Sequence, residues 1–195
     1  VYEKYRQGDF AQALEGLQRL YTKVPGWLQL SLLEAHIHRK SGAVLSEIRI
    51  LQEMTERKNA IAEEASILAE AWSMLGSAYS SLGCQDEARE AFIASAGWEN
   101  QLDQRRKEYS NAIFVSNYME TDLEEMKKLY GAYRKTLQNI KPYRRVFYAH
   151  RRLRAGYLSA DVRCHPVAYF AAALLEQFDR DQFEVYCYAA NEEDW

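Results

Sequence analysis

The segment from Trp72 to Phe92 constrains the fold more than any other part of the sequence. It reads Trp-x-x-Leu-Gly-x-x-Tyr and continues, after a short break, with Ala88 and Phe92 four residues apart. Small and large apolar residues at these intervals suit two helices that pack closely against each other. Such a pair buries its apolar face only when similar pairs stack beside it. The segment therefore predicts an array of stacked helix pairs.

Glycines upstream repeat at a similar interval and identify the kind of array. Gly42 lies 34 residues after Gly8, and Gly83 follows Gly42 by 41 residues. A period of ~34 residues with this pattern of apolar residues is that of the tetratricopeptide repeat, or TPR. The longer second interval predicts an insertion of seven residues around 58–64. We predict about three repeats over residues 1–98, the first of them incomplete.

In a TPR array the regularly spaced apolar residues form the core, and function belongs to the concave surface. Gly76 and Ala88 are small enough to let two helices approach closely. The concave surface is formed by the first helix of each repeat and can take an extended peptide. His38, Ser77 and Ser80 are our candidate peptide contacts in this groove. A lone histidine in such a place is more often solvated or capping.

Helix is predicted to continue beyond the repeats, until the composition changes. Residues 99–140 have apolar positions at helical spacing and predict bridging helices. Thr121 precedes Glu124 by three residues, as in a capping box. Residues 141–152 hold several lysines and arginines and no acidic residue. This basic segment predicts a solvated linker, with anion or phosphate binding as the alternative.

Residues 153–195 predict the start of an α/β domain. A short apolar run ends in turn-forming residues, then "HPVAYFAAALLEQF" has helical spacing and "FEVYCYAA" is β-branched and aromatic. A strand, a helix opened by Pro166 and a second strand form a βαβ unit, in which the strands are parallel. Ligands of open α/β sheets bind beyond the carboxyl ends of the strands. Ser159, Asp161 and His165 all lie on the turn at that edge.

Composition excludes several classes of partner. The formal net charge of −3 gives no overall attraction to nucleic acid or to anionic lipid. The three cysteines are widely spaced, with no CxxC pair and no histidine cluster, so we expect reduced thiols and no metal site. No apolar run approaches the ~20 residues of a membrane span. We therefore expect a cytoplasmic protein with no nucleic-acid or membrane partner.

The end of the chain resembles a known enzyme family. The segments "LRAGYLSADVRCHPVAYF" and "FDRDQFEVYCYA" are similar, in order and spacing, to the protein O-linked N-acetylglucosamine transferases and their SPINDLY-like relatives. The preceding "YSNAIFVSNYMETDLEEMKKLYGAY" is also similar to that family. The resemblance is close from about residue 69 and looser before it. Val162 departs from the family, which usually has an aromatic residue after the aspartate.

This resemblance implies both a fold and an activity. The fold is mostly α: a TPR helical solenoid with bridging helices, followed by the first βαβ unit of a Rossmann-like glycosyltransferase domain. The activity is transfer of a sugar from a nucleotide sugar, such as UDP-GlcNAc or GDP-fucose, to Ser or Thr hydroxyls of proteins held in the TPR groove, without a metal or other cofactor. His165 and Asp161 are then the catalytic candidates. From the residues alone, His165 is equally well interpreted as a cap of the helix that Pro166 opens.

The sequence also leaves alternatives open. It starts at Val1 and ends in Glu-Glu-Asp-Trp, so we expect the N-terminal part of a longer enzyme, inactive by itself. The competing hypothesis is a TPR scaffold that binds a partner peptide without catalysis.

Two parallel strands also leave an open edge, which is a template for a second copy of the chain. We therefore expect a homodimer or larger species.

Overall fold

The computed structural model describes residues 1–57, 62–144 and 149–190 and divides the chain into two compact units. The first unit is Val1–Lys141 and the second is Pro142–Trp195. The predicted insertion at 58–64 and the basic segment at 141–152 each lie partly outside the described residues. The last five residues of the predicted 153–195 domain lie wholly outside the described residues.

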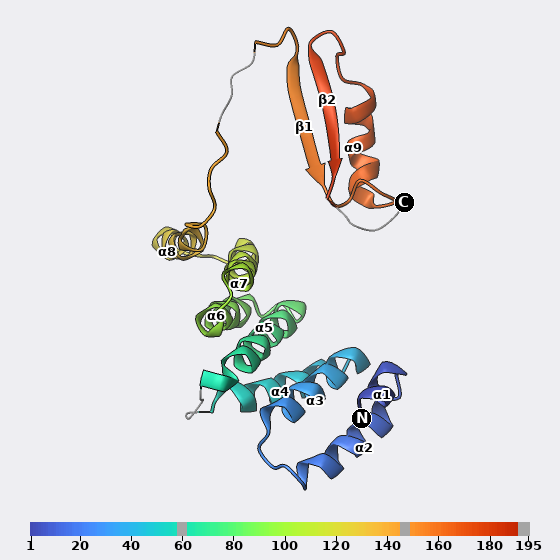
Figure 1. Cartoon of the computed structure of the whole chain (residues 1–195), viewed down its shortest axis with the longest axis vertical. Coiled ribbons are helices and arrows are strands. Elements are labelled where there is room, and N and C mark those ends of the chain that lie inside the picture. Colours follow the sequence, from blue (N-terminus) through green and yellow to red (C-terminus); the bar gives the residue numbers. More distant parts are fainter. Residues whose placement is uncertain (58–61, 145–148, 191–195) are drawn as a thin grey trace. The chain divides into compact units, whose positions relative to one another are not determined.

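The first unit is a stack of antiparallel helix pairs (Figure 1). The paired helices are α1 (Tyr2–Arg6) with α2 (Phe10–Tyr21), α3 (Leu28–Ser41) with α4 (Val44–Thr55), α5 (Ala65–Ser81) with α6 (Gln85–Trp98), and α7 (Leu102–Val115) with α8 (Leu123–Lys135). Short 3-10 turns, η1 (Ala62–Glu64) and η2 (Ser116–Tyr118), precede α5 and follow α7. Each helix packs mainly on its neighbours along the chain, so the predicted array of stacked pairs is confirmed.

The repeated glycines lie in the turns between paired helices. Gly8, Gly42 and Gly83 have φ angles of +80°, +77° and +79°, in the left-handed region that glycine enters without steric cost. They join α1 to α2, α3 to α4 and α5 to α6. The sequence spacing that indicated the repeat thus reflects one turn geometry used three times.

Close packing between α5 and α6 explains the small residues of the third repeat. Ala88 is fully buried, and a Cβ atom placed on Gly76 would lie only 2.8 Å from Cδ1 of Phe92. No side chain fits at position 76 unless the Phe92 ring moves. The prediction that Gly76 and Ala88 permit close approach of two helices is therefore confirmed.

The bridging helices form a further pair, with a start that differs from the predicted one. The side chain of Asp122 caps α8, because its Oδ2 accepts a hydrogen bond from the backbone N–H of Glu124 at 3.0 Å. The Thr121 hydroxyl instead lies 3.5 Å from the carbonyl oxygen of Ser116, on the preceding turn. The predicted capping box at Thr121 is wrong, because the carboxylate one residue later takes that place.

The second unit is a βαβ unit, as predicted. Strands β1 (Leu153–Ser159) and β2 (Phe183–Ala189) are parallel, and helix α9 (Pro166–Glu176) connects them. The register pairs Leu153 with Phe183 and Ser159 with Ala189, so both strands end at the same edge. No side chain in the described part of this unit is fully buried.

We expect Gly76→Ala to destabilise the solenoid by ~1–3 kcal/mol, because the added methyl group overpacks against Phe92. Gly131→Ala is the matched control: position 131 lies inside α8 with nothing within 4 Å of a new Cβ, so alanine should stabilise the helix by ~0.5–1 kcal/mol. Thermal unfolding followed by circular dichroism measures both effects. Equal midpoints for the two variants would contradict the packing argument.

Candidate functional site

The turn that follows β1 occupies the carboxyl edge of the two-stranded sheet (Figure 1). The Ser159 hydroxyl accepts a hydrogen bond from the backbone N–H of Asp161 at 3.0 Å, which fixes the start of the turn. The carbonyl oxygen of Ser159 accepts one from the N–H of Ala190 at 3.0 Å, which ties the ends of β1 and β2 together. The turn is therefore held at the edge where α/β sheets bind ligands.

His165 and Asp161 come together on this turn. His165 is the N-cap of α9, and its Nδ1 accepts a hydrogen bond from the backbone N–H of Val167 at 3.3 Å. The same Nδ1 lies 3.8 Å from Oδ2 of Asp161. About a third of each side chain is exposed, so both groups are open to solvent and to a ligand.

These two contacts of Nδ1 require different protonation states. Accepting from Val167 needs an unprotonated Nδ1, which leaves the neutral ring with its proton on Nε2. Pairing with the Asp161 carboxylate needs a proton on Nδ1. The cap and the pairing with Asp161 therefore cannot both use Nδ1 at the same time.

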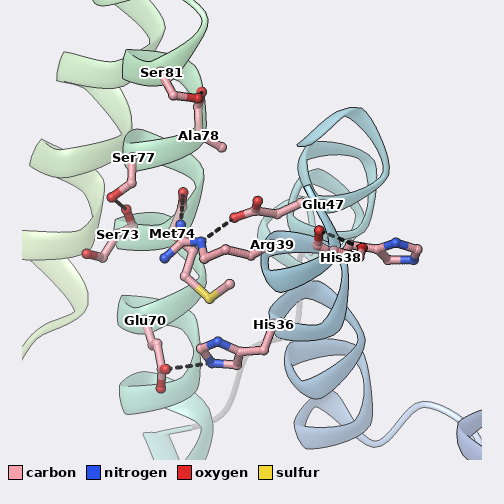
Figure 2. Close-up of polar contacts among 11 residues, drawn as sticks. His36, His38, Arg39, Glu47, Glu70, Ser73, Met74, Ser77, Ala78 and Ser81 are labelled. Atoms are coloured by element: carbon pink, nitrogen blue, oxygen red, sulfur yellow. Dashed lines mark hydrogen bonds and ion pairs between the residues drawn. The ribbon is translucent and has the colours of Figure 1, made fainter. Parts of the chain in front are cut away.

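In the solenoid, polar contacts join residues of α3 and α5 that are 34 or 35 positions apart in the sequence (Figure 2). Nε2 of His36 lies 3.0 Å from Oε1 of Glu70, and Nη2 of Arg39 donates to the carbonyl oxygen of Met74 at 2.9 Å. Arg39 also donates through Nε to Oε1 of Glu47 at 2.8 Å. Glu47 is only 2% exposed, so Arg39 neutralises a carboxylate inside the array. The hydrogen bond with His36 lowers the pKa of the Glu70 carboxyl.

The next contact in this row joins α5 to α7. The Ser73 hydroxyl donates to Oε1 of Glu108 at 3.0 Å, across a sequence separation of 35 residues. Glu108 is 5% exposed, and its Oε2 has no hydrogen-bond partner. Burial raises the pKa of the Glu108 carboxyl, and hydrogen bonds from Ser73 and Asn111 oppose this only in part.

The predicted groove residues fall in two places. Ser77 and Ser80 line one cavity of about 350 Å³, together with Asn111 and Phe114 from α7. His38 lies on α3 with its ring turned away from α5 (Figure 2). The structure therefore brings the two serines together and places the histidine apart from them.

Sequence reasoning missed Glu108, Asn111 and Phe114. All three are on α7, which the sequence assigned to a bridging segment outside the repeats. The available signal was the spacing, since Glu108 follows Ser73 by 35 residues and Ser73 follows Arg39 by 34. The TPR residue pattern fades at α7, while the repeat spacing of the polar contacts continues.

Some kinds of site are missing from the described part of the chain. No group of three or more His, Cys, Asp or Glu side chains is placed there to hold a metal ion. None of the described helices is both long enough and apolar enough to cross a membrane. Cys84, Cys164 and Cys187 are free thiols.

Comparison with known proteins finds a family model that matches the C-terminal third of the chain. Residues 133–195, which include the turn with Asp161 and His165, match the family model described as glycosyl transferase family 41. The expected resemblance is confirmed. No curated protein matches the chain.

Among solved structures, a mutant of the Thermobaculum terrenum O-GlcNAc transferase matches with a TM-score of 0.59 and 21% identity. The match covers 99% of this chain and 36% of that chain, so this chain spans little more than a third of the enzyme. The likeness shows a shared fold of helical array and following α/β unit. The MamA protein matches with a TM-score of 0.32 and 17% identity over 70% of this chain and 85% of its own.

We expect Glu108→Gln to stabilise the solenoid at neutral pH by on the order of 1 kcal/mol, because it removes a buried charge and keeps a group that can accept from Ser73. When folding raises the pKa of a carboxyl, the folded protein loses stability as the pH rises above the ordinary pKa of that group, which is 4.5. The gain should therefore be present at pH 7 and vanish below about pH 4.

Urea unfolding of both proteins across this pH range measures the difference in the free energy of unfolding. Glu90→Gln, at an exposed position on α6, is the matched control and should change little. A Glu108→Gln variant less stable than the original at pH 7 would contradict the buried-charge argument.

Proposed function

We propose that this chain is the N-terminal part of a protein O-glycosyltransferase, which transfers a sugar from a nucleotide sugar to Ser or Thr hydroxyls of proteins. The observation that carries the proposal is the family 41 match over residues 133–195, because it includes the turn where Asp161 and His165 meet. The match to an O-GlcNAc transferase fold along nearly the whole chain supports the same assignment.

In this proposal His165 handles the proton of the acceptor hydroxyl. The hydroxyl oxygen forms a bond to the anomeric carbon of the sugar, while the bond from that carbon to the diphosphate breaks and the nucleotide diphosphate leaves. The imidazole accepts the proton that the hydroxyl loses, directly or through a water molecule. Asp161, 3.8 Å from Nδ1, stabilises the imidazolium that results.

The start of α9 supports the same step electrostatically. The helix has its first N–H groups at the turn, where a partial positive charge favours an anion. Such a terminus helps to hold the negative charge that develops on the leaving diphosphate. In this proposal, the choice between N-acetylglucosamine and fucose depends on parts of the complete enzyme outside this chain, which covers 36% of the matched enzyme.

The solenoid groove is proposed to hold the protein substrate. Its support is the row of polar groups along α3, α5 and α7 and the open cavity lined by Ser77 and Ser80. Helical solenoids use their extended concave surfaces for binding. The same cavity would serve a TPR scaffold without catalysis, which remains the alternative function.

The test is sugar transfer by the complete protein that contains this chain. Incubation with labelled UDP-GlcNAc and with labelled GDP-fucose should leave label on protein from one of the two donors. We expect His165→Ala to lower turnover by ~100-fold or more, since a general acid or base is lost. If neither donor leaves label on protein, the alternative function, a TPR scaffold without catalysis, is favoured.

His165→Asn separates catalysis from capping. Asparagine is a good N-cap residue, so this variant keeps a side-chain cap on α9 but has no imidazole. If His165 acts on the acceptor proton, turnover falls as far in His165→Asn as in His165→Ala. Turnover close to the original in His165→Asn would restrict His165 to the capping role.

A further inference from the structure

The turn that carries Asp161 and His165 begins at Ser159, the last residue of β1. Ser159 accepts two hydrogen bonds, which come from different parts of the unit. Its carbonyl oxygen accepts from the backbone N–H of Ala190, just after β2, and its hydroxyl accepts from the backbone N–H of Asp161, each at 3.0 Å. The carbonyl group therefore fixes Ser159 to the sheet, and the hydroxyl fixes Asp161 to Ser159.

The contact with the hydroxyl determines where the carboxylate of Asp161 lies. It closes a tight turn between residues two positions apart, a conformation that serine and threonine hydroxyls favour. In this turn Oδ2 of Asp161 lies 3.8 Å from Nδ1 of His165. Because about a third of the Asp161 side chain is exposed, the surrounding side chains confine it little. The hydrogen bond to its backbone is thus the contact that limits its movement.

The imidazole of His165 is held from the other side of the turn. His165 is the N-cap of α9, and its Nδ1 accepts from the backbone N–H of Val167 at 3.3 Å. The imidazole therefore takes its position from the helix, whereas the carboxylate of Asp161 takes its position from the sheet. The distance between the two groups depends on both supports, and Ser159 supplies the one on the side of the sheet.

We propose that Ser159 is a positioning residue of the transfer reaction, whose hydroxyl holds Asp161 where the carboxylate stabilises the imidazolium of His165. The inference rests on the proposed function and adds a residue that acts through Asp161. Electrostatic stabilisation is most effective when the charged group is already in place before the reaction, as supporting hydrogen bonds ensure. Loss of one neutral hydrogen bond corresponds to a change in rate of about 3- to 10-fold.

The first experiment measures the hydrogen bond in the 195-residue chain, where no reaction is needed. NMR measurement of exchange between backbone amides and water reports the protection of each N–H group. Ser159→Ala should raise the exchange rate of the Asp161 amide about 3- to 10-fold. Ser159→Thr should keep the rate low, because threonine retains the hydroxyl. The internal reference is the amide of Asp181, which donates to Oδ1 of Asp179 at 2.9 Å in a similar turn and should not change.

The second experiment measures turnover by the complete protein with Ser159→Ala, Asp161→Asn and the double variant. Ser159→Ala should lower kcat about 3- to 10-fold and leave KM for the nucleotide sugar close to its original value. Asp161→Asn removes the charge that Ser159 holds in place. The addition of Ser159→Ala to Asp161→Asn should therefore lower kcat little further. Ser159→Thr should keep kcat near the original.

The outcomes separate this inference from the function on which it rests. An unchanged exchange rate of the Asp161 amide in Ser159→Ala would overturn the positioning role. Equal losses of kcat from Ser159→Ala with and without the Asp161 carboxylate would also overturn it, because the hydroxyl would then act independently of Asp161. If the unaltered complete protein transfers no sugar, the proposed function fails and the inference fails with it, even where NMR confirms the hydrogen bond.

Discussion

The contact between Gly76 and the ring of Phe92 sets how closely α5 and α6 can lie. A Cβ atom on Gly76 would lie only 2.8 Å from Cδ1 of Phe92, so the two helices are as close as a glycine allows. The outer faces of this compact pair must be covered by the neighbouring pairs. An array of this kind has no single central core, and its buried residues instead form successive clusters along the stack. The position of every groove residue on α3, α5 and α7 follows from this stacking.

Stacking at a fixed period also brings polar groups into register. Each helix pair has nearly the same geometry as the one before it, so residues 34 or 35 positions apart meet between the first helices of neighbouring pairs. His36 meets Glu70 in this way, and Ser73 meets Glu108. Contacts of this kind resist sliding of one pair along the next, since a shift of one turn would separate every partner.

Much of the fold could be predicted from the sequence because its strongest signals are local. The left-handed turn at Gly42 and the proline that opens α9 depend on few neighbours. The direction of His38 was available too, since helix geometry places residues 36 and 39 on one face and 38 on another. The contacts of Glu108 and Asn111 were harder to predict, because the TPR pattern fades at α7 and only the 35-residue spacing between Ser73 and Glu108 remains as a signal.

The absence of any fully buried side chain in the described part of the βαβ unit has a consequence for its dynamics. The paired residues of β1 and β2 are 30 positions apart in the sequence. In the solenoid, by contrast, most contacts join helices that follow one another along the chain. Local opening needs little free energy where few apolar groups are removed from water. In hydrogen exchange, the backbone amides of β1 and β2 would therefore lose their protons sooner than those in the middle of α5. Within the described residues, the βαβ unit is therefore expected to open more readily than the middle of the helical array.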